Sequence, residues 1–146
     1  MALFERGLKD LQFNDEGNLL MQNWAEGAGE GKTLILGEGA VTAGGTTTMY
    51  TVPAGKIAYI TNSSLSATNK VQNSIREDAS IDVVIDGVGY SLLRLTLPSN
   101  LSGANLQHAV NQNFPVPIKL KGGDIIRTYS TSIYAFGNCQ GWEQDK

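Results

Sequence analysis

The chain has one cysteine, Cys139, and one histidine, His108, in 146 residues. A single cysteine excludes an internal disulfide framework and a cysteine-cluster metal site, so we interpret Cys139 as a small buried hydrophobe. One histidine cannot build a multi-histidine metal centre, and we expect His108 to be hydrogen-bonded or at the surface. No apolar run approaches the roughly 18 residues of a membrane helix, and the first residues lack the order of a secretory signal. We therefore expect a protein made in the cytoplasm.

Charge is scarce and unevenly placed. The net charge is −3, but residues 1–30 carry two basic and six acidic side chains, and the remaining 116 residues carry nine basic and eight acidic ones. A near-neutral body behind an acidic N-terminal segment offers no broad basic surface, which argues against nucleic acid as a partner.

Motifs for chemistry are also missing. The run Gly27–Thr33 resembles a phosphate-binding loop, but it is one residue too short and a strand-like segment, Leu34–Leu36, follows it. Asp82 and Asp86 could hold calcium, although turn solvation explains them equally well. No serine has a base and an orienting group in a recognisable motif. We predict no enzyme activity and no catalytic, cofactor or metal site.

What the chain has is strand and turn signals. Asp86-Gly87 is the strongest hairpin signal, Pro53 is expected at the second position of a turn with Gly55 at the fourth, and Gly122–Asp124 should reverse the chain. The adjacent Leu92-Leu93 pair predicts a bulge or a change of face. Strands are predicted near 33–36, 47–53, 56–66, 80–86, 88–97, 106–111, 115–121, 124–131, 133–137 and 139–144.

This pattern predicts an all-β fold, a two-sheet antiparallel β-sandwich that is most economically jelly-roll-like. An immunoglobulin-like sandwich is the alternative. The tyrosines fall inside predicted strands, where aromatic side chains usually pack, so they would form a sugar-binding platform only if several were exposed together. Asn69–Ser80 and Pro98–Asn105 are predicted to be exposed loops.

Residues 1–30 are predicted to form an extended N-terminal arm, and residues 31–146 the sandwich domain. The arm carries apolar side chains in a segment too short to bury them alone, and these are the candidate partner-docking residues: Phe4, Leu8, Leu11, Leu19, Leu20 and Trp24. The arm could lie on its own sandwich or reach a neighbouring subunit.

Four segments, in order, resemble small β-sandwich virion proteins of tailed bacteriophages: residues 50–60, 82–87, 117–126 and 141–143. These proteins include capsid decoration (cement), head-fibre and tail-associated proteins, and the likeness spans roughly residues 47–144. It brings no catalytic residues.

The resemblance implies a structural virion protein, first of all a capsid decoration protein that binds the major capsid protein or another virion protein as a homo-oligomer, possibly a trimer. It implies no cofactor, nucleic acid or membrane. The alternative is a fibre or tail module that recognises a receptor or glycan through residues 67–80 and 98–113.

Overall fold

The computed structural model describes residues 12–13, 19–20 and 31–146. This part of the chain contains ten strands and no helix. Two short strands, β1 (Gln12–Phe13) and β2 (Leu19–Leu20), pair with each other. The other eight form two antiparallel four-stranded sheets. They are β3 (Lys32–Val41), β4 (Gly45–Thr51), β5 (Lys56–Asn69), β6 (Glu77–Ile85), β7 (Val88–Leu97), β8 (Leu106–Lys121), β9 (Ile125–Ser130) and β10 (Tyr134–Asp145). Within this part of the chain no helix could cross a membrane.

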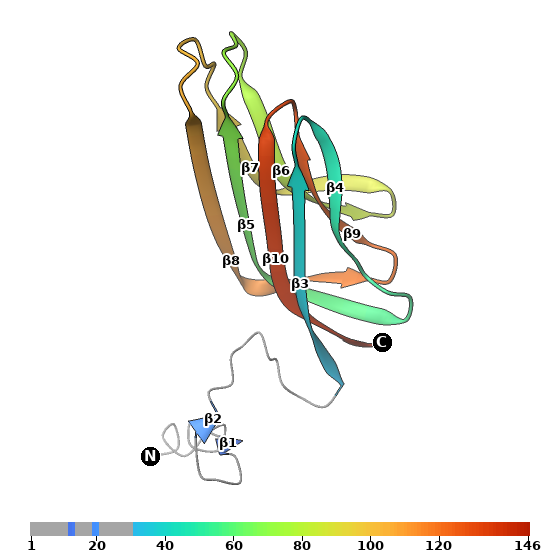
Figure 1. Ribbon diagram of the computed structural model, residues 1–146. Coiled ribbons are helices and arrows are strands. Elements are labelled where there is room, and N and C mark those ends of the chain that lie inside the picture. Colours follow the sequence, from blue (N-terminus) through green and yellow to red (C-terminus); the bar gives the residue numbers. More distant parts are fainter. Residues whose placement is uncertain (1–11, 14–18, 21–30) are drawn as a thin grey trace.

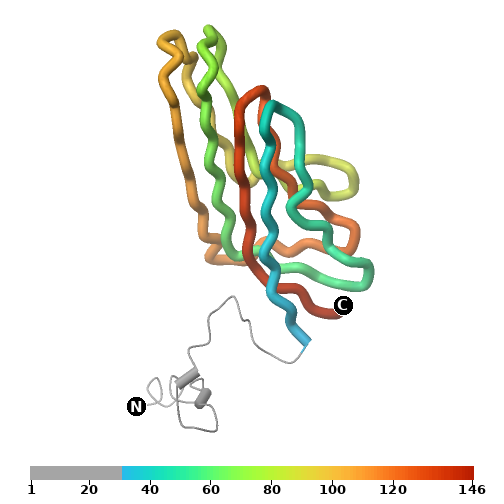
Figure 2. Tube along the Cα trace, in the orientation of Figure 1, coloured from blue at the N-terminus to red at the C-terminus, as the bar shows by residue number. Residues whose placement is uncertain are grey.

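The first sheet has the order β3-β10-β5-β8, and the second has the order β4-β9-β6-β7. Figure 1 shows the first sheet in front of the second. Successive strands switch sheets, except at the β6–β7 hairpin, so that β10 pairs with β3 although they are far apart in sequence (Figure 2). The predicted two-sheet antiparallel β-sandwich is confirmed, and the strand order is that of a jelly-roll-like sandwich.

One apolar core fills the space between the sheets. Side chains alternate between the two faces of a strand, and on each sheet one set points inward. Ile60 and Leu65 from the first sheet and Ile81 and Ile126 from the second are fully buried in it. Cys139 is buried there too, as predicted, and burial raises the pKa of its thiol to about 11.

Inward-facing glycines let the sheets approach closely at β3 and β10. A Cβ at Gly37 would lie 2.8 Å from Cys139 Sγ, and one at Gly137 would collide with the Thr128 hydroxyl. The sequence predicts only residues 33–36 as a strand here, whereas β3 runs from Lys32 to Val41. The reason is that Met49 and Thr128 of the opposite sheet fill the space that side chains on these glycines would occupy.

Two turns bond to each other at one end of the sandwich. Lys56 N–H donates to Pro53 O at 3.1 Å and Gly55 has φ 79°, so Pro53 and Gly55 take the first and third turn positions. The predicted placement at the second and fourth positions is wrong because Val52 O accepts from Gly123 N–H instead, at 2.9 Å. The reversal at Gly122–Asp124 is confirmed, since Asp124 N–H donates to Lys121 O at 3.0 Å.

The β6–β7 hairpin follows the sequence closely. Asp86 and Gly87 have φ values of 52° and 81°, as a two-residue type I′ turn requires, and Ile85 pairs with Val88. The predicted bulge is also present, because Ile81 pairs with Leu93 and Asp82 with Ser91, which leaves Leu92 unpaired.

Two predicted strand breaks do not exist. The segments 106–111 and 115–121 form the single strand β8, and 133–137 and 139–144 form the single strand β10. In β8, the ladder with β5 passes from Asn113 to Ile118, so Phe114–Pro117 forms a wide bulge. A proline-containing bulge is tolerated because β8 is an edge strand with one free side.

The predicted loop at Pro98–Asn105 is confirmed, and the one at Asn69–Ser80 is partly wrong. Asn69 ends β5 and Glu77–Ser80 begin β6, so that loop covers residues 70–76. Of the predicted recognition segments, 67–80 and 98–113, the second extends into β8, which contains residues 106–113. These two loops lie together, since Asn73 N–H donates to Asn100 O at 2.9 Å.

Polar residues in and beside these two loops form a buried network. The sequence alone does not indicate that these polar side chains are buried. The buried Glu77 carboxylate accepts hydrogen bonds from Asn73 Nδ2 at 2.9 Å, from Ser132 Oγ at 2.6 Å and from the Thr131 hydroxyl. Asn100 is buried as well and donates from Nδ2 to Asn69 O, at the end of β5, at 3.2 Å and to Ala104 O at 2.6 Å. Side-chain bonds thus tie the two loops to the sandwich.

The predicted docking segment falls mostly outside the described residues. Phe4, Leu8, Leu11 and Trp24 lie outside them, and of Leu19 and Leu20 only the backbone pairing in β2 is described. The division into an arm at 1–30 and a sandwich at 31–146 stays a prediction.

Candidate functional site

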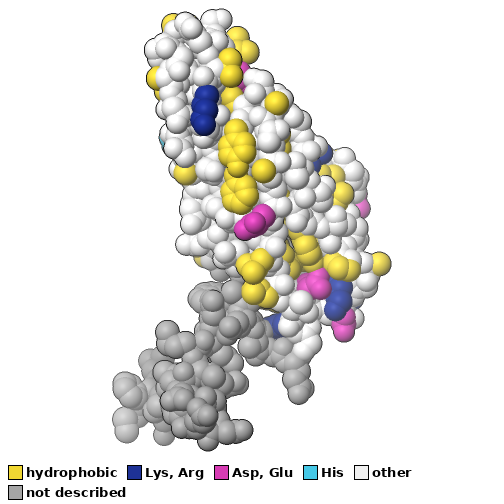
Figure 3. Space-filling view, in the orientation of Figure 1, with side chains coloured by type: hydrophobic (Ala, Val, Ile, Leu, Met, Phe, Trp, Pro, Cys, Tyr) yellow, Lys and Arg dark blue, Asp and Glu magenta, His cyan; other side chains and the backbone are white. Residues whose placement is uncertain are grey.

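The first sheet presents an outer face with almost no charge, which we call the uncharged face. Its two central strands direct the following side chains outward: Tyr134, Phe136, Asn138, Gln140, Trp142 and Gln144 from β10, and Ile57, Tyr59, Asn62, Ser64, Ser66 and Thr68 from β5. None of these is an Asp, Glu, Lys, Arg or His. Charged outward side chains lie on the edge strands, such as Glu38 on β3 and Lys119 on β8. Figure 3 shows this face, with scattered apolar groups among uncharged polar atoms.

Four apolar side chains gather at the end of this face where β3 begins, and we call them the apolar corner: Leu34, Leu36, Tyr59 and Trp142. The Tyr59 and Trp142 rings stack with centroids 5.4 Å apart, and Lys32 Nζ lies 5.3 Å from the Trp142 ring. Leu34 is 44% exposed and Leu36 is 66% exposed. An exposed apolar cluster with polar surroundings is typical of an interaction site.

The middle of the uncharged face is built from amides and hydroxyls. Asn62 on β5 donates from Nδ2 to Asn111 Oδ1 at 2.8 Å and also to Asn113 Oδ1, both on β8. Ser64 and Ser66 continue the row along β5. Neutral groups of this kind can exchange water for a partner at a lower desolvation cost than charges.

The outer face of the second sheet is charged. Arg94 Nη2 lies 2.7 Å from Asp78 Oδ2, and Arg127 Nε lies 3.7 Å from Asp82 Oδ2. Hydrogen bonds from Thr96 and Arg94 hold the pKa of Asp78 below its usual value. The two outer faces therefore differ in kind, and the uncharged one is the better candidate for contact with a partner.

The ionisable groups weighed in the sequence do not converge. Arg127 faces Asp82, and Lys121 Nζ lies 2.9 Å from Asp86 Oδ1, so each aspartate already has a cation from the chain. His108 is exposed on β8, as predicted. Among the described residues no three His, Cys, Asp or Glu side chains group together as metal ligands.

The uncharged face was not predicted, although the sequence contains its signal. No charged residue occurs from Ile57 to Asn69 or from Tyr134 to Trp142. Strand alternation alone would have placed half of each run on an outer face, but the pairing of β5 with β10 had to be known to join the two runs.

Fold and surface together define the class: a small antiparallel β-sandwich with one charged and one uncharged outer face. No family model and no curated protein sequence matches the chain. Among solved structures it is similar to a pentameric capsid protein isolated from metagenomic phage sequences, with 17% identity over 89% of this chain and 72% of that one, and a TM-score of 0.42. A second solved structure, also described as a pentameric capsid protein isolated from metagenomic phage sequences, matches at 19% identity over 75% of this chain, with a TM-score of 0.40. The chain spans 59% of the length of that protein.

A chain from Bacillus endospore appendages, described as disulfide-linked pili, is also similar, with 12% identity over 78% of this chain and 89% of that one, and a TM-score of 0.28. The structural neighbours thus include phage capsid proteins. At these identities and TM-scores the likenesses are too distant to assign a function.

Proposed function

We propose that this chain is a structural protein of a bacteriophage virion, of the capsid decoration (cement) type, which binds the shell and stabilises it as a homo-oligomer. The virion class comes from the order of strand and turn segments that resembles small phage sandwich proteins. The observation that carries the oligomer is the uncharged face, and its occupant is a second copy of the chain.

The uncharged face has the size of a stable interface. β10 has 12 residues. Without the first two, at the loop end, the remaining ten span about 33 Å at about 3.3 Å per residue. Four strands at about 4.8 Å make the sheet about 19 Å wide. The product is about 630 Å² per copy, or about 1,260 Å² for a pair of copies, which is at the lower end of the roughly 1,200–2,000 Å² of a standard protein interface.

The composition of the face supports self-association. Interface cores are depleted in charge and enriched in aromatic side chains, and the outward positions of the central strands supply Tyr59, Phe136 and Trp142 but no Asp, Glu, Lys, Arg or His. A twofold axis parallel to the strands would place β3 of one copy over β8 of the other.

Pairing through the free edge of β8 is a poorer alternative. Edge-to-edge pairing needs a continuous row of free N–H and C=O groups, and Pro115 and Pro117 in the bulge lack the N–H. Face-to-face contact is therefore favoured over pairing through β8.

Attachment to the shell is assigned to residues 1–30. This segment is acidic and carries six candidate docking side chains in a length too short to bury them alone. Its partner would be the major capsid protein or another virion protein.

Imaging of purified particles tests the assignment. Particles of the encoding phage, made with and without the chain, are compared by cryo-electron microscopy, and we expect extra density at regular positions on the shell. A chain lacking residues 2–24 should fold, as circular dichroism would show, but should not decorate particles that lack the native protein. Decoration by this shortened chain would refute the role of the arm, and absence of the native chain from particles would refute the virion assignment.

A second candidate is a receptor- or glycan-recognition module of a fibre or tail. It is favoured by one observation, a pocket at the loop end of the sandwich. Extra density at a fibre or tail rather than over the shell would select it.

A further inference from the structure

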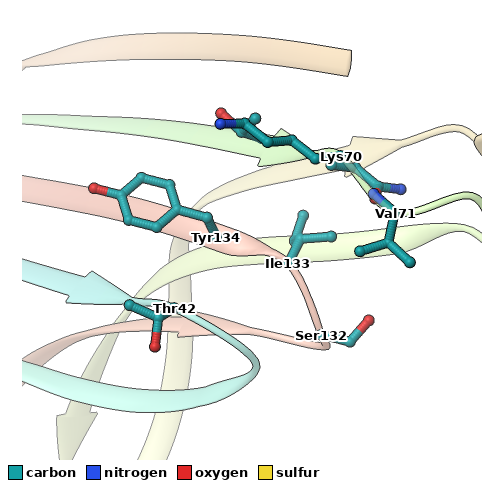
Figure 4. A pocket seen from close by; sticks show the side chains of 8 residues that line it. Thr42, Lys70, Val71, Ser132, Ile133 and Tyr134 are labelled. Carbon is teal, nitrogen blue, oxygen red and sulfur yellow. The ribbon is translucent and has the colours of Figure 1, made fainter. Parts of the chain in front are cut away.

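A pocket of about 380 Å³ opens at the end of the sandwich that carries the 70–76 and 98–105 loops. It lies where β5 ends and β10 begins, beside the end of β3. Its volume falls within the range of about 300–1,000 Å³ usual for small-molecule sites. Figure 4 shows Tyr134 and Lys70 extending in the same direction, with Tyr134 between Lys70 and Thr42 in this view.

Tyr134 gives the pocket an aromatic wall. It pairs with Thr68 on β5 and points away from the core, and it remains 43% exposed. The face of an aromatic ring is electron-rich and attracts the polarised C–H groups of an apolar ring face. A saccharide ring has such a face and is surrounded by hydroxyl groups.

Two further polar groups line the same pocket. Asn69 is 1% exposed; its Oδ1 accepts from Val71 N–H at 3.1 Å, but its Nδ2 has no partner among the described residues. A buried donor without a partner is costly, and an acceptor on a ligand would satisfy this one once the Asn69 amide turned outward, because Nδ2 itself is buried. Ser132 donates its hydroxyl hydrogen to Glu77 at 2.6 Å, which leaves its oxygen able to accept from a ligand.

Lys70 sets the charge of the pocket. It is the only charged residue among those that line the pocket within the described chain, and none of the ion pairs described there involves it. A free ammonium beside an aromatic ring and neutral hydrogen-bonding groups favours a ligand that has one anionic group on a hydroxyl-rich ring. We propose that this pocket binds an acidic saccharide unit, with Tyr134 under the ring and Lys70 at its anionic group. The pocket uses the Tyr134 and Thr68 end of the uncharged face, and the proposed self-association would use the rest of that face.

A glycan array of acidic and neutral saccharides, followed by NMR titration of the ¹⁵N-labelled full chain, tests this. The titrated probes are glucuronic acid, glucose 6-phosphate, glucose and inorganic phosphate. We expect saturable shifts at residues 42, 68–71 and 132–134, and binding of the acidic sugars about fivefold tighter than that of glucose, the contribution of one exposed ion pair. Glucuronic acid and glucose 6-phosphate together show whether the anionic group is a carboxylate or a phosphate.

Three variants test which residues of the pocket contact the saccharide. Lys70→Met should remove the preference for acidic sugars and keep weak binding of glucose, whereas Tyr134→Ala should weaken both. Lys119→Met is the control, because it removes an exposed lysine at the other end of the same sheet. The proposal is overturned if no saccharide gives saturable shifts, if phosphate alone reproduces them, or if Lys70→Met retains the preference.

Discussion

Replacing Leu36 with glutamate should break the self-association proposed for the uncharged face. Leu36 is 66% exposed in the single chain, so an interface over the apolar corner would bury most of that exposed part. Burying a whole leucine side chain is worth about 1.5–3 kcal/mol, so the exposed two thirds is worth about 1–2 kcal/mol. In a twofold interface the residue counts twice, which gives about 2–4 kcal/mol and a dissociation constant raised about 30- to 1,000-fold. In a ring it counts once, and the effect is about 5- to 30-fold.

Sedimentation velocity over a concentration series measures this change. The matched control is Val88→Glu, which puts the same charge in place of another exposed apolar strand residue, 53% exposed, on the opposite sheet. Both variants should melt within a few degrees of the parent, because exposed positions contribute little to stability. An unchanged association of Leu36→Glu, or an equal loss in Val88→Glu, would show that the uncharged face is not the contact surface. A loss seen only when residues 1–30 are also present would instead identify the arm of a neighbouring copy as the occupant.

Three predictions concern the sandwich itself. Gly137→Ala should lower the free energy of unfolding by about 1–3 kcal/mol in urea titrations, because its Cβ would collide with Thr128 between the sheets, whereas the exposed Thr46→Ala should cost less. The pKa of Asp78 is depressed in the fold, so the stability that this carboxylate contributes is present above the unfolded pKa of about 4 and is lost as the pH falls through the folded pKa. As the pH is lowered from about 6 to about 2, the melting temperature should therefore fall less steeply for Asp78→Asn than for the parent chain. Equal slopes would contradict this. Cys139 is buried, with a pKa of about 11, so a thiol reagent at pH 8 should label it only after unfolding, and rapid labelling of the folded chain would show that its strand opens.

Local signals predicted the fold where turn chemistry and alternation agree. Asp86-Gly87 and the Leu92 bulge follow from backbone angles and register within one hairpin, and the structure has both. Predictions failed where a segment distant in the sequence determines the local backbone conformation. Val52 O is taken by Gly123 rather than by its own turn, and the glycines of β3 continue a strand because the other sheet fills their space. Neither Gly123 nor the strands of the opposite sheet can be identified from the residues around Val52 or around the β3 glycines.

The candidate surface was missed for the same reason. Charge depletion in the β5 and β10 segments is visible in the sequence, but two runs more than 60 residues apart become one face only through their pairing. The loop-end pocket could not be predicted from the sequence either. The sequence pattern assigns Asn69 to a polar loop and Tyr134 to a core strand, and nothing in it brings the two segments together. The predicted site at Phe4, Leu8, Leu11, Leu19, Leu20 and Trp24 remains a prediction.

The two proposed surfaces can be tested separately because they lie at opposite ends of one strand. Tyr134 and Trp142 are eight positions apart on β10, about 26 Å at 3.3 Å per residue. A saccharide on Tyr134 therefore cannot touch Leu36, whose neighbour on β10 is Gln140. If Leu36→Glu weakens binding to a multivalent glycan surface but leaves the affinity for a single glucuronic acid unchanged, the oligomer contributes by presenting several pockets at once. Decoration of a shell through residues 1–30 and adhesion to a glycan through the Tyr134 pocket would then be two uses of one assembly.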